Sequence, residues 1–144
     1  QPRKSREMFA PYRPAAAAYR KLDLETAVAQ ADPHALVAML YDGALAAIAQ
    51  AHGVGEAPDP ALRGAATTRA LRILEEGLKA SLDPRGGEIA ANLQTLYDYM
   101  ILRLLGANAH ADGAAYAEVA AMLQQLREAW QGTAPQARQA AVAA

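Results

Sequence analysis

The chain has 144 residues, a formal net charge of −1 and a hydrophobic content of 53%, and Ala alone contributes 38 residues. Strong helix formers dominate and β-branched residues are scarce, which excludes an all-β fold and makes a parallel sheet a poor fit. Cys is absent, so the chain has no thiol nucleophile, disulfide framework or cysteine-based metal site. The length fits one domain.

The charge is distributed unevenly. Residues 1–21 carry six Lys or Arg against one Glu, a net charge of +5, whereas the remainder carries eight basic and 14 acidic groups, a net charge of −6. We interpret the basic segment as an arm that lies against its own acidic body, and we predict no nucleic-acid partner, since no aromatic residues are interleaved with the arginines. No apolar run approaches the roughly 18 residues of a membrane span, and the N-terminus lacks the apolar core of a signal peptide, so a cytoplasmic protein is expected.

Three prolines interrupt the N-terminal segment, which we expect to be a flexible basic arm over residues 1–14. Residues 1–7 are interpreted as an extension upstream of a start at Met8. The spacing of apolar residues predicts a shorter helix within residues 16–30. At the other end, residues 133–144 are expected to form a flexible, Ala-rich tail.

Four long helices are predicted between these ends, at about 33–51, 60–82, 87–109 and 113–131. Asp32-Pro33 and Asp59-Pro60 each place an N-cap acid before a proline at the first helical position. Gly86-Gly87 indicates a tight turn before the third helix, and Asp112 is the predicted cap of the fourth. The short connections make neighbours antiparallel. The fold class is therefore all-α, an antiparallel up-down four-helix bundle over residues 15–132, with a short N-terminal arm or helix.

Two helices carry more apolar residues than one core stripe needs. In the first helix, Val37, Tyr41 and Leu45 lie beside the row that begins with Leu36 and Leu40, and in the third helix Tyr97 and Ile101 flank the main row. A wide, Ala-lined core explains this surplus, and so does an outer groove that takes a partner's helix. Both interpretations stay open on the sequence alone. Asp substitutions at Val37 or Ile101 would separate them, because only a core residue would unfold the bundle when charged.

The remaining polar and aromatic residues indicate other four-helix proteins only weakly. A histidine phosphotransfer domain, which is also a four-helix bundle, needs an exposed helical His near a Lys and a Gly, and His34 has neither beside it. No His follows a Glu by three residues, so a ferritin-like di-iron site is excluded. Asp42 and Asp98 are expected to act as caps or to pair with an Arg across helices, and Trp130 is expected to close one end of the bundle. No catalytic constellation remains, and no cofactor or metal is predicted.

A set of short motifs resembles the FliS family of flagellar export chaperones. The motifs follow in the family's order from about residue 12 to residue 131, and they are Tyr19, Ala31-Asp-Pro-His34, Leu40-Tyr-Asp-Gly-Ala44, Ser81-Leu-Asp83, Gly86-Gly-Glu-Ile-Ala90, Leu96-Tyr-Asp-Tyr-Met100 and Arg127-Glu-Ala-Trp130. The resemblance implies a cytoplasmic four-helix bundle without catalysis. It also implies that the partner is the C-terminal segment of flagellin, which is unstructured before assembly and helical in the filament.

Binding of that segment would prevent premature polymerisation and keep flagellin competent for type III export. The histidine phosphotransfer domain remains the alternative function. A contact with the flagellar export apparatus and a weak homodimer are compatible with this interpretation. The predicted flagellin-binding residues are Tyr19, Val37, Leu40, Tyr41, Leu45, Leu93, Tyr97, Met100 and Ile101.

Overall fold

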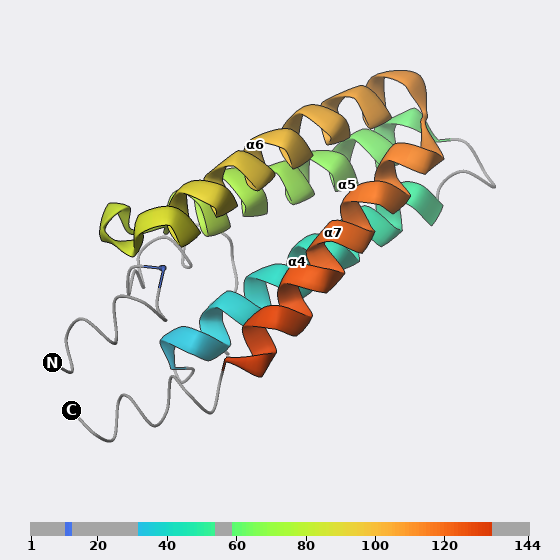
Figure 1. The fold of residues 1–144 in the computed structure, drawn as a ribbon. Coiled ribbons are helices and arrows are strands. Elements are labelled where there is room, and N and C mark those ends of the chain that lie inside the picture. Colours follow the sequence, from blue (N-terminus) through green and yellow to red (C-terminus); the bar gives the residue numbers. More distant parts are fainter. Residues whose placement is uncertain (1–10, 13–31, 54–58, 134–144) are drawn as a thin grey trace, which may run out of the picture.

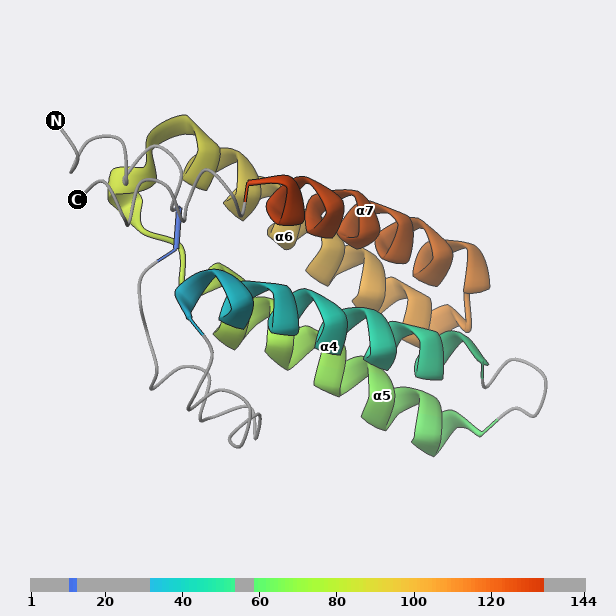
Figure 2. The same ribbon diagram turned by 90° about the horizontal axis from the view of Figure 1, so that it is seen from below.

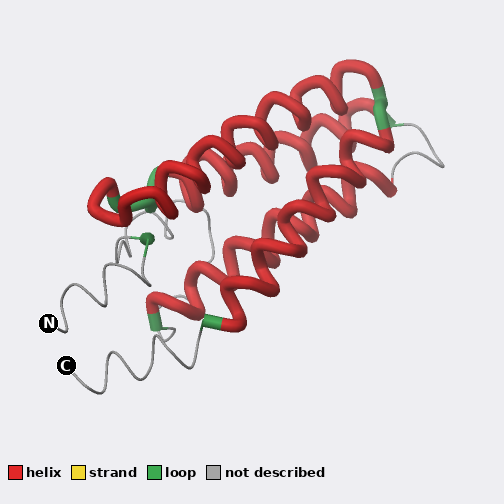
Figure 3. Tube along the Cα trace, viewed as in Figure 1, coloured by secondary structure: helices red, strands yellow, loops and turns green. Residues whose placement is uncertain are grey.

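The computed structural model describes residues 11–12, 32–53 and 59–133. Its long helices are α4 (Pro33–Gly53), α5 (Pro60–Arg72), which continues into the π-helix η2 (Ile73–Lys79), α6 (Gly87–His110) and α7 (Gly113–Gly132). A single 3₁₀ turn, η3 (Pro84–Gly86), leads into α6. Figure 3 draws these residues as helices joined by short loops, with no strand among them.

The helices occupy the four corners of a bundle. α4 packs against α5 and α7, while α6 packs against η2, α5 and α7. In Figure 1 α6 lies over α5 and α7 lies over α4, and the turned view in Figure 2 shows α4 running beside α5. Consecutive helices run in opposite directions. The predicted all-α, antiparallel, up-down four-helix bundle is confirmed.

The predicted first residue of each helix is also confirmed. Asp59 caps α5, where its Oδ1 accepts hydrogen bonds from the backbone N–H groups of Ala61 and Leu62 at 3.1 and 3.2 Å. Asp112 caps α7 in the same way. Asp32 accepts from the N–H of Ala35 at 2.7 Å. These carboxylates satisfy N–H groups that the first turn of a helix leaves without partners.

The second helix departs from the prediction at its C-terminal end. The sequence predicts one helix over 60–82. In the structure the hydrogen bonding becomes π-helical at Ile73, and the helix ends at Lys79. The wider turn is closed by a hydrogen bond of 3.0 Å from the N–H of Ala80 to the carbonyl of Glu75. Asp83 then adopts an extended backbone before Pro84, because a residue that precedes proline is disfavoured in the helical region. Hydrophobic spacing does not separate a π-turn from an α-turn.

The turn into α6 uses the glycine pair that the sequence singles out. Gly87 has a φ of +64°, a conformation that disfavours residues with a Cβ. Gly86 permits a close approach, since a Cβ at this position would lie 3.2 Å from the Cα of Pro11. The predicted tight turn is therefore present, and it is also the point where residues 11–12 reach the bundle.

The core contains both apolar rows of α4. Leu36, Leu40, Val37 and Tyr41 are all buried, because α4 has α5 on one side and α7 on the other. The second row is thus explained largely by a wide core, and only Leu45 of that row is partly buried. α6 differs, since several of its large apolar side chains are exposed to solvent. The exposed large hydrophobic residues of the described chain are Leu62, Ile89, Tyr99, Leu102 and Leu105.

Ion pairs lie along the sides of the bundle. Arg127 of α7 pairs with Asp42 of α4, as expected for that aspartate. Asp98 of α6 pairs across the helices with Lys79 of η2 at 2.7 Å, so its partner is a lysine rather than the expected arginine. Arg103 of α6 pairs with Glu118 of α7 at 2.7 Å. The side chains of these pairs remain partly or largely exposed, so they contribute little to stability.

By length and composition, α4 is apolar enough to cross a membrane, the only such helix in the described part of the chain. Here it packs between α5 and α7, and eight of its residues are buried in the core. The predicted short helix within 16–30, Tyr19 and the C-terminal tail from 134 lie outside the described residues.

Candidate functional site

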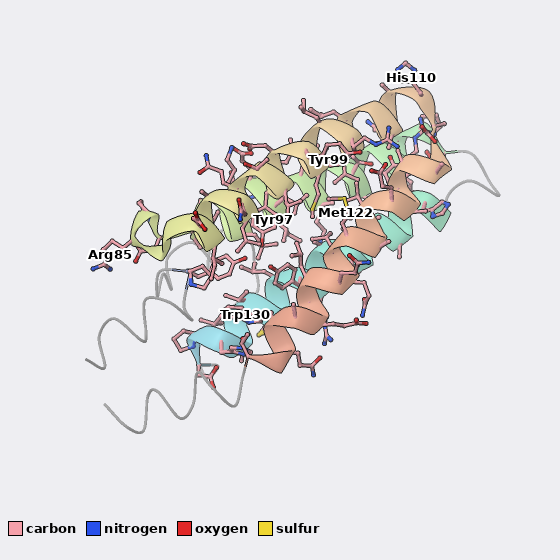
Figure 4. All side chains as sticks on the ribbon, viewed as in Figure 1. Arg85, Tyr97, Tyr99, His110, Met122 and Trp130 are labelled. Atoms are coloured by element: carbon pink, nitrogen blue, oxygen red, sulfur yellow. The ribbon has the colours of Figure 1, made fainter. Side chains whose placement is uncertain are left out.

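Three tyrosine hydroxyls meet at the end of the bundle where α4 begins. Tyr41 comes from α4, Tyr97 from α6, and Tyr12 from the segment before the bundle. The hydroxyl of Tyr41 lies 2.6 Å from that of Tyr97 and 3.0 Å from that of Tyr12, and Tyr12 also bonds to Tyr97. Figure 4 shows Tyr97 pointing from α6 into the bundle. We refer to Tyr12, Tyr41 and Tyr97 as the tyrosine cluster.

Burial governs the chemistry of the tyrosine cluster. Desolvation raises the pKa of Tyr41, and the hydrogen bonds from Tyr12 and Tyr97 offset only part of that rise. The pKa of Tyr97 lies well above its usual value, first because of burial and then because Tyr12 and Tyr41 are so close. The hydroxyls of Tyr41 and Tyr97 are therefore neutral at physiological pH, and they act as hydrogen-bonding groups rather than as bases or nucleophiles.

Pro11 and Tyr12 are held by the turn that precedes α6. The carbonyl of Pro11 accepts a hydrogen bond of 2.6 Å from the N–H of Asp83, and Tyr12 forms an isolated antiparallel bridge with Leu82. The Tyr12 side chain is 8% exposed. A residue from outside the four helices thus completes this end of the core.

Trp130 borders the same end. Its indole N–H donates to the carbonyl of His34 at 2.9 Å, and Nε2 of His34 lies 2.8 Å from the carbonyl of Trp130. The two rings stack with centroids 4.4 Å apart, while Tyr12 meets the indole edge-on at 5.4 Å. The interpretation of Trp130 as a residue that closes the bundle end agrees with these contacts. His34 is a partner of Trp130, and its Nε2 is already engaged.

A pocket of about 240 Å³ opens beside the tyrosine cluster. Its walls come from Pro11, α4, α6, α7 and Thr133 just after α7, and none of its lining side chains is charged. The lining residues are Pro11, Tyr41, Ile89, Leu93, Leu126, Ala129, Trp130 and Thr133. We call this the end pocket. Half of the Ile89 side chain is exposed to solvent, so an apolar wall stands open.

The predicted binding residues do not form one surface. Tyr41 and Leu93 line the end pocket, whereas Ile101 lines a second pocket of about 260 Å³ between α5–η2 and α6. Tyr97, a member of the tyrosine cluster, is fully buried. The predicted residues buried in the core are Val37, Leu40, Tyr41, Tyr97 and Met100, and the partly buried ones are Leu45, Leu93 and Ile101.

Sequence reasoning did not assign Tyr12, Ile89, Leu126 or Trp130 to this surface. The regular apolar spacing of the third and fourth helices predicts Ile89, Leu126 and Trp130 as core residues, and periodicity does not show which residues of such a row line an open pocket. Tyr12 gave a weak signal, since it is an aromatic residue next to Pro11 inside a basic arm. The described residues contain no group of three or more His, Asp or Glu side chains able to hold a metal ion.

Comparison with known proteins gives one consistent result. The family described as flagellar protein FliS matches residues 15–137. The flagellar secretion chaperone FliS of Salmonella typhimurium strain LT2 is 46% identical over 121 residues, which are 83% of this chain and 90% of that protein. The flagellar secretion chaperone FliSB of Pseudomonas aeruginosa is 39% identical over 79% of this chain and 90% of its own length. FliS of Escherichia coli K12 is 38% identical over 78% and 84%, respectively. This chain therefore belongs to the FliS family of flagellar secretion chaperones.

Proposed function

We propose that this protein is a cytoplasmic export chaperone that binds the C-terminal segment of flagellin before secretion. The observation that carries the proposal is the end pocket, an open apolar site beside a point where the bundle already holds a segment from outside its four helices. Pro11 and Tyr12 already pack against this end of the bundle, so the same end is suited to binding a segment of another chain. Membership of a family of flagellar secretion chaperones supports flagellin as the cargo.

The energetics require several contacts. Burying one large apolar side chain contributes about 1.5–3 kcal/mol, and folding a disordered segment on binding costs about 2–5 kcal/mol or more. Ile89 is half exposed and Leu93, Leu126 and Trp130 are already partly buried, so no one of them offsets that cost, and a bound segment must contact all four and make further contacts beside them. An amphipathic helix that packs into the end pocket would cover them at once.

Bound flagellin would have its C-terminal segment covered, which would prevent that segment from polymerising in the cytoplasm. The histidine phosphotransfer alternative gains no support, because His34 is stacked on Trp130 and hydrogen-bonded through Nε2. A contact with the export apparatus and a weak homodimer remain compatible with the proposal. The exposed Leu102 and Leu105 of α6 lie away from the end pocket and are available for such contacts.

The test is a pair of matched substitutions on α6. Ile89→Asp places a charge in the end pocket at a half-exposed position, and Leu102→Asp places the same charge at a position that is 69% exposed and lines neither pocket. Both variants should remain folded by circular dichroism. We expect flagellin to co-purify with the wild type and with Leu102→Asp but not with Ile89→Asp, and a flagellin that lacks its C-terminal segment to co-purify with none. Equal binding by both variants would overturn the assignment of the end pocket.

A further inference from the structure

The tyrosine cluster is a closed ring of hydrogen bonds. Each phenol has one hydrogen to donate, and the three hydroxyls make three mutual contacts. Each hydroxyl can therefore donate once and accept once within the ring. No hydroxyl hydrogen is left without an acceptor, even though Tyr41 is 2% exposed and Tyr97 is fully buried.

Displacement of Tyr12 would open this ring. Tyr41 and Tyr97 would keep the bond between them, and one of the two would lose the acceptor for its hydrogen. Water satisfies that hydroxyl as long as the site is open. A partner that covers the site with apolar side chains alone would exclude the water and bury an unpaired hydroxyl, which weakens binding.

We propose that the partner segment places one neutral hydrogen-bonding side chain, a hydroxyl or an amide, where the Tyr12 hydroxyl now lies. This inference rests on the proposed function and adds to it that the flagellin segment replaces Tyr12. It adds a specificity requirement to a site that otherwise selects only for apolar surface. Segments that are equally apolar but lack such a side chain would be rejected.

The group must come from a side chain. Flagellin's C-terminal segment is expected to bind as a helix, and the N–H and carbonyl groups inside a helix are already paired with each other. At a position inside the helix, only a side chain is therefore free to bond to the two phenols.

The group must also be uncharged. Ile89, Leu93, Leu126 and Trp130 line the adjoining pocket, and no charged side chain is among its lining residues to offset a buried carboxylate or ammonium group. Desolvating an ion without a partner costs far more than desolvating a hydroxyl or an amide. Tyr41 and Tyr97 are themselves held neutral by burial, so the complete arrangement carries no charge.

The experiment measures the affinity of full-length chaperone variants for flagellin by calorimetry. All variants carry Tyr12→Phe, so that the ring is already open and the native segment competes equally in each. Tyr97→Phe is added in one, and Tyr116→Phe in its control. Tyr116 bonds to Thr67 at the far end of the bundle, so its variant loses a tyrosine hydroxyl without touching the site. Tyr41→Phe serves as a second test variant.

We expect Tyr97→Phe to weaken flagellin binding by roughly 5- to 30-fold and Tyr116→Phe to leave it unchanged. A serine-to-alanine and amide-to-alanine scan of flagellin's C-terminal segment should identify one residue whose loss weakens binding to Tyr12→Phe but has no further effect when Tyr97→Phe is present. Unchanged or tighter binding by both Tyr97→Phe and Tyr41→Phe would overturn the inference and leave the proposed function standing. Absence of flagellin binding by the wild type would overturn both.

Discussion

The two ends of the bundle are closed in different ways. At the far end, the hydroxyl of Tyr116 in α7 forms a hydrogen bond of 2.7 Å with the hydroxyl of Thr67 in α5. The Thr67 hydroxyl in turn donates a hydrogen bond to the carbonyl of Arg63. His52 of α4 stacks near the Tyr116 ring, with centroids 6.3 Å apart. Every group in this arrangement belongs to the four helices. At the near end, the tyrosine cluster is complete only when Tyr12 joins it from outside the bundle.

This difference indicates which end of the bundle contributes mainly to stability and which end is suited to binding a partner. A contact made wholly within the helices is lost only when the bundle opens, so the far end serves stability. A contact that depends on a separate segment can be exchanged for another segment while the helices stay packed. The near end also has the end pocket, an uncharged site that includes the half-exposed Ile89, while toward the far end Leu62 and Leu105 are exposed without lining that pocket. We therefore propose the near end as the site of partner binding.

The largest expected effect tests whether the second apolar row belongs to the core or to a partner. Val37 is 1% exposed, so Val37→Asp buries a charge without a partner and should unfold the protein, with a loss of several kcal/mol. Ile101 lines a pocket at the surface, and Ile101→Asp should remain folded. Circular dichroism and thermal melting check both. A folded Val37→Asp variant would contradict the burial of this row.

Flagellin binding by the Ile101→Asp variant then tests how far the binding site extends along α6. If flagellin occupies only the end pocket, this variant should bind like the wild type. If binding is lost, flagellin extends along α6 to the second pocket as well, as the sequence analysis predicted for Ile101. Leu102→Asp, from the next position of the same helix, is the matched control because it lines neither pocket.

The second prediction compares the two ends directly through Tyr116→Ala and Tyr12→Ala. Tyr116 is 2% exposed within the helices, and its truncation should cost about 3–5 kcal/mol in the free energy of unfolding. Tyr12→Ala should cost less, because the space it leaves opens towards the end pocket and can fill with water. Urea denaturation measures both values. A larger loss for Tyr12→Ala would mean that residues 11–12 are a fixed part of the fold.

Flagellin binding should respond in the opposite order. Tyr12→Ala removes the side chain that completes the tyrosine cluster at the near end, so the affinity for flagellin should stay the same or rise. Tyr116→Ala should affect affinity only through the folded fraction. Calorimetry below the melting range of both variants separates the two effects, and a marked loss of affinity in Tyr12→Ala would show that Tyr12 contacts flagellin rather than competing with it.

The sequence predicted the bundle and the first residue of each helix because these depend on local chemistry. An aspartate followed by proline specifies a helix start, and regular apolar spacing specifies which face is buried. The sequence did not show that α4 would bury both of its rows, because that depends on α4 having α5 on one side and α7 on the other. Tyr12 was missed for a related reason, since its contacts are with Tyr41, Tyr97 and Trp130, which lie far along the chain.

The third prediction concerns how the stability of the fold depends on pH through Tyr41 and Tyr97 at the near end. The pKa values of Tyr41 and Tyr97 are raised in the folded state, so above pH ~10 the unfolded chain ionises these groups while the folded protein keeps them protonated. The unfolded state then binds fewer protons, and stability falls as pH rises. Each tyrosine contributes at most about 1.4 kcal/mol per pH unit. Urea denaturation across this range should show a shallower loss in Tyr97→Phe than in the wild type, and equal slopes would contradict the predicted shift.

The smallest expected effect comes from the sides of the bundle, at Asp98→Asn. The hydrogen bond that Lys79 donates to Asp98 is the largest cause of the raised pKa of Lys79, and Glu75 adds to it. When the pKa of a lysine is higher in the folded state than in the unfolded state, the stabilisation is fully present below the unfolded-state pKa. It is lost as the pH rises towards the folded-state pKa, so the Lys79–Asp98 pair contributes to stability in the same alkaline range as the tyrosines. Because both side chains are partly exposed, the neutral-pH melting temperature should not change measurably, and flagellin affinity should be that of the wild type. A loss of affinity here would place a partner contact on η2 and α6, away from both ends, whereas an alkaline slope close to that of the wild type would assign the pH response to the tyrosine cluster.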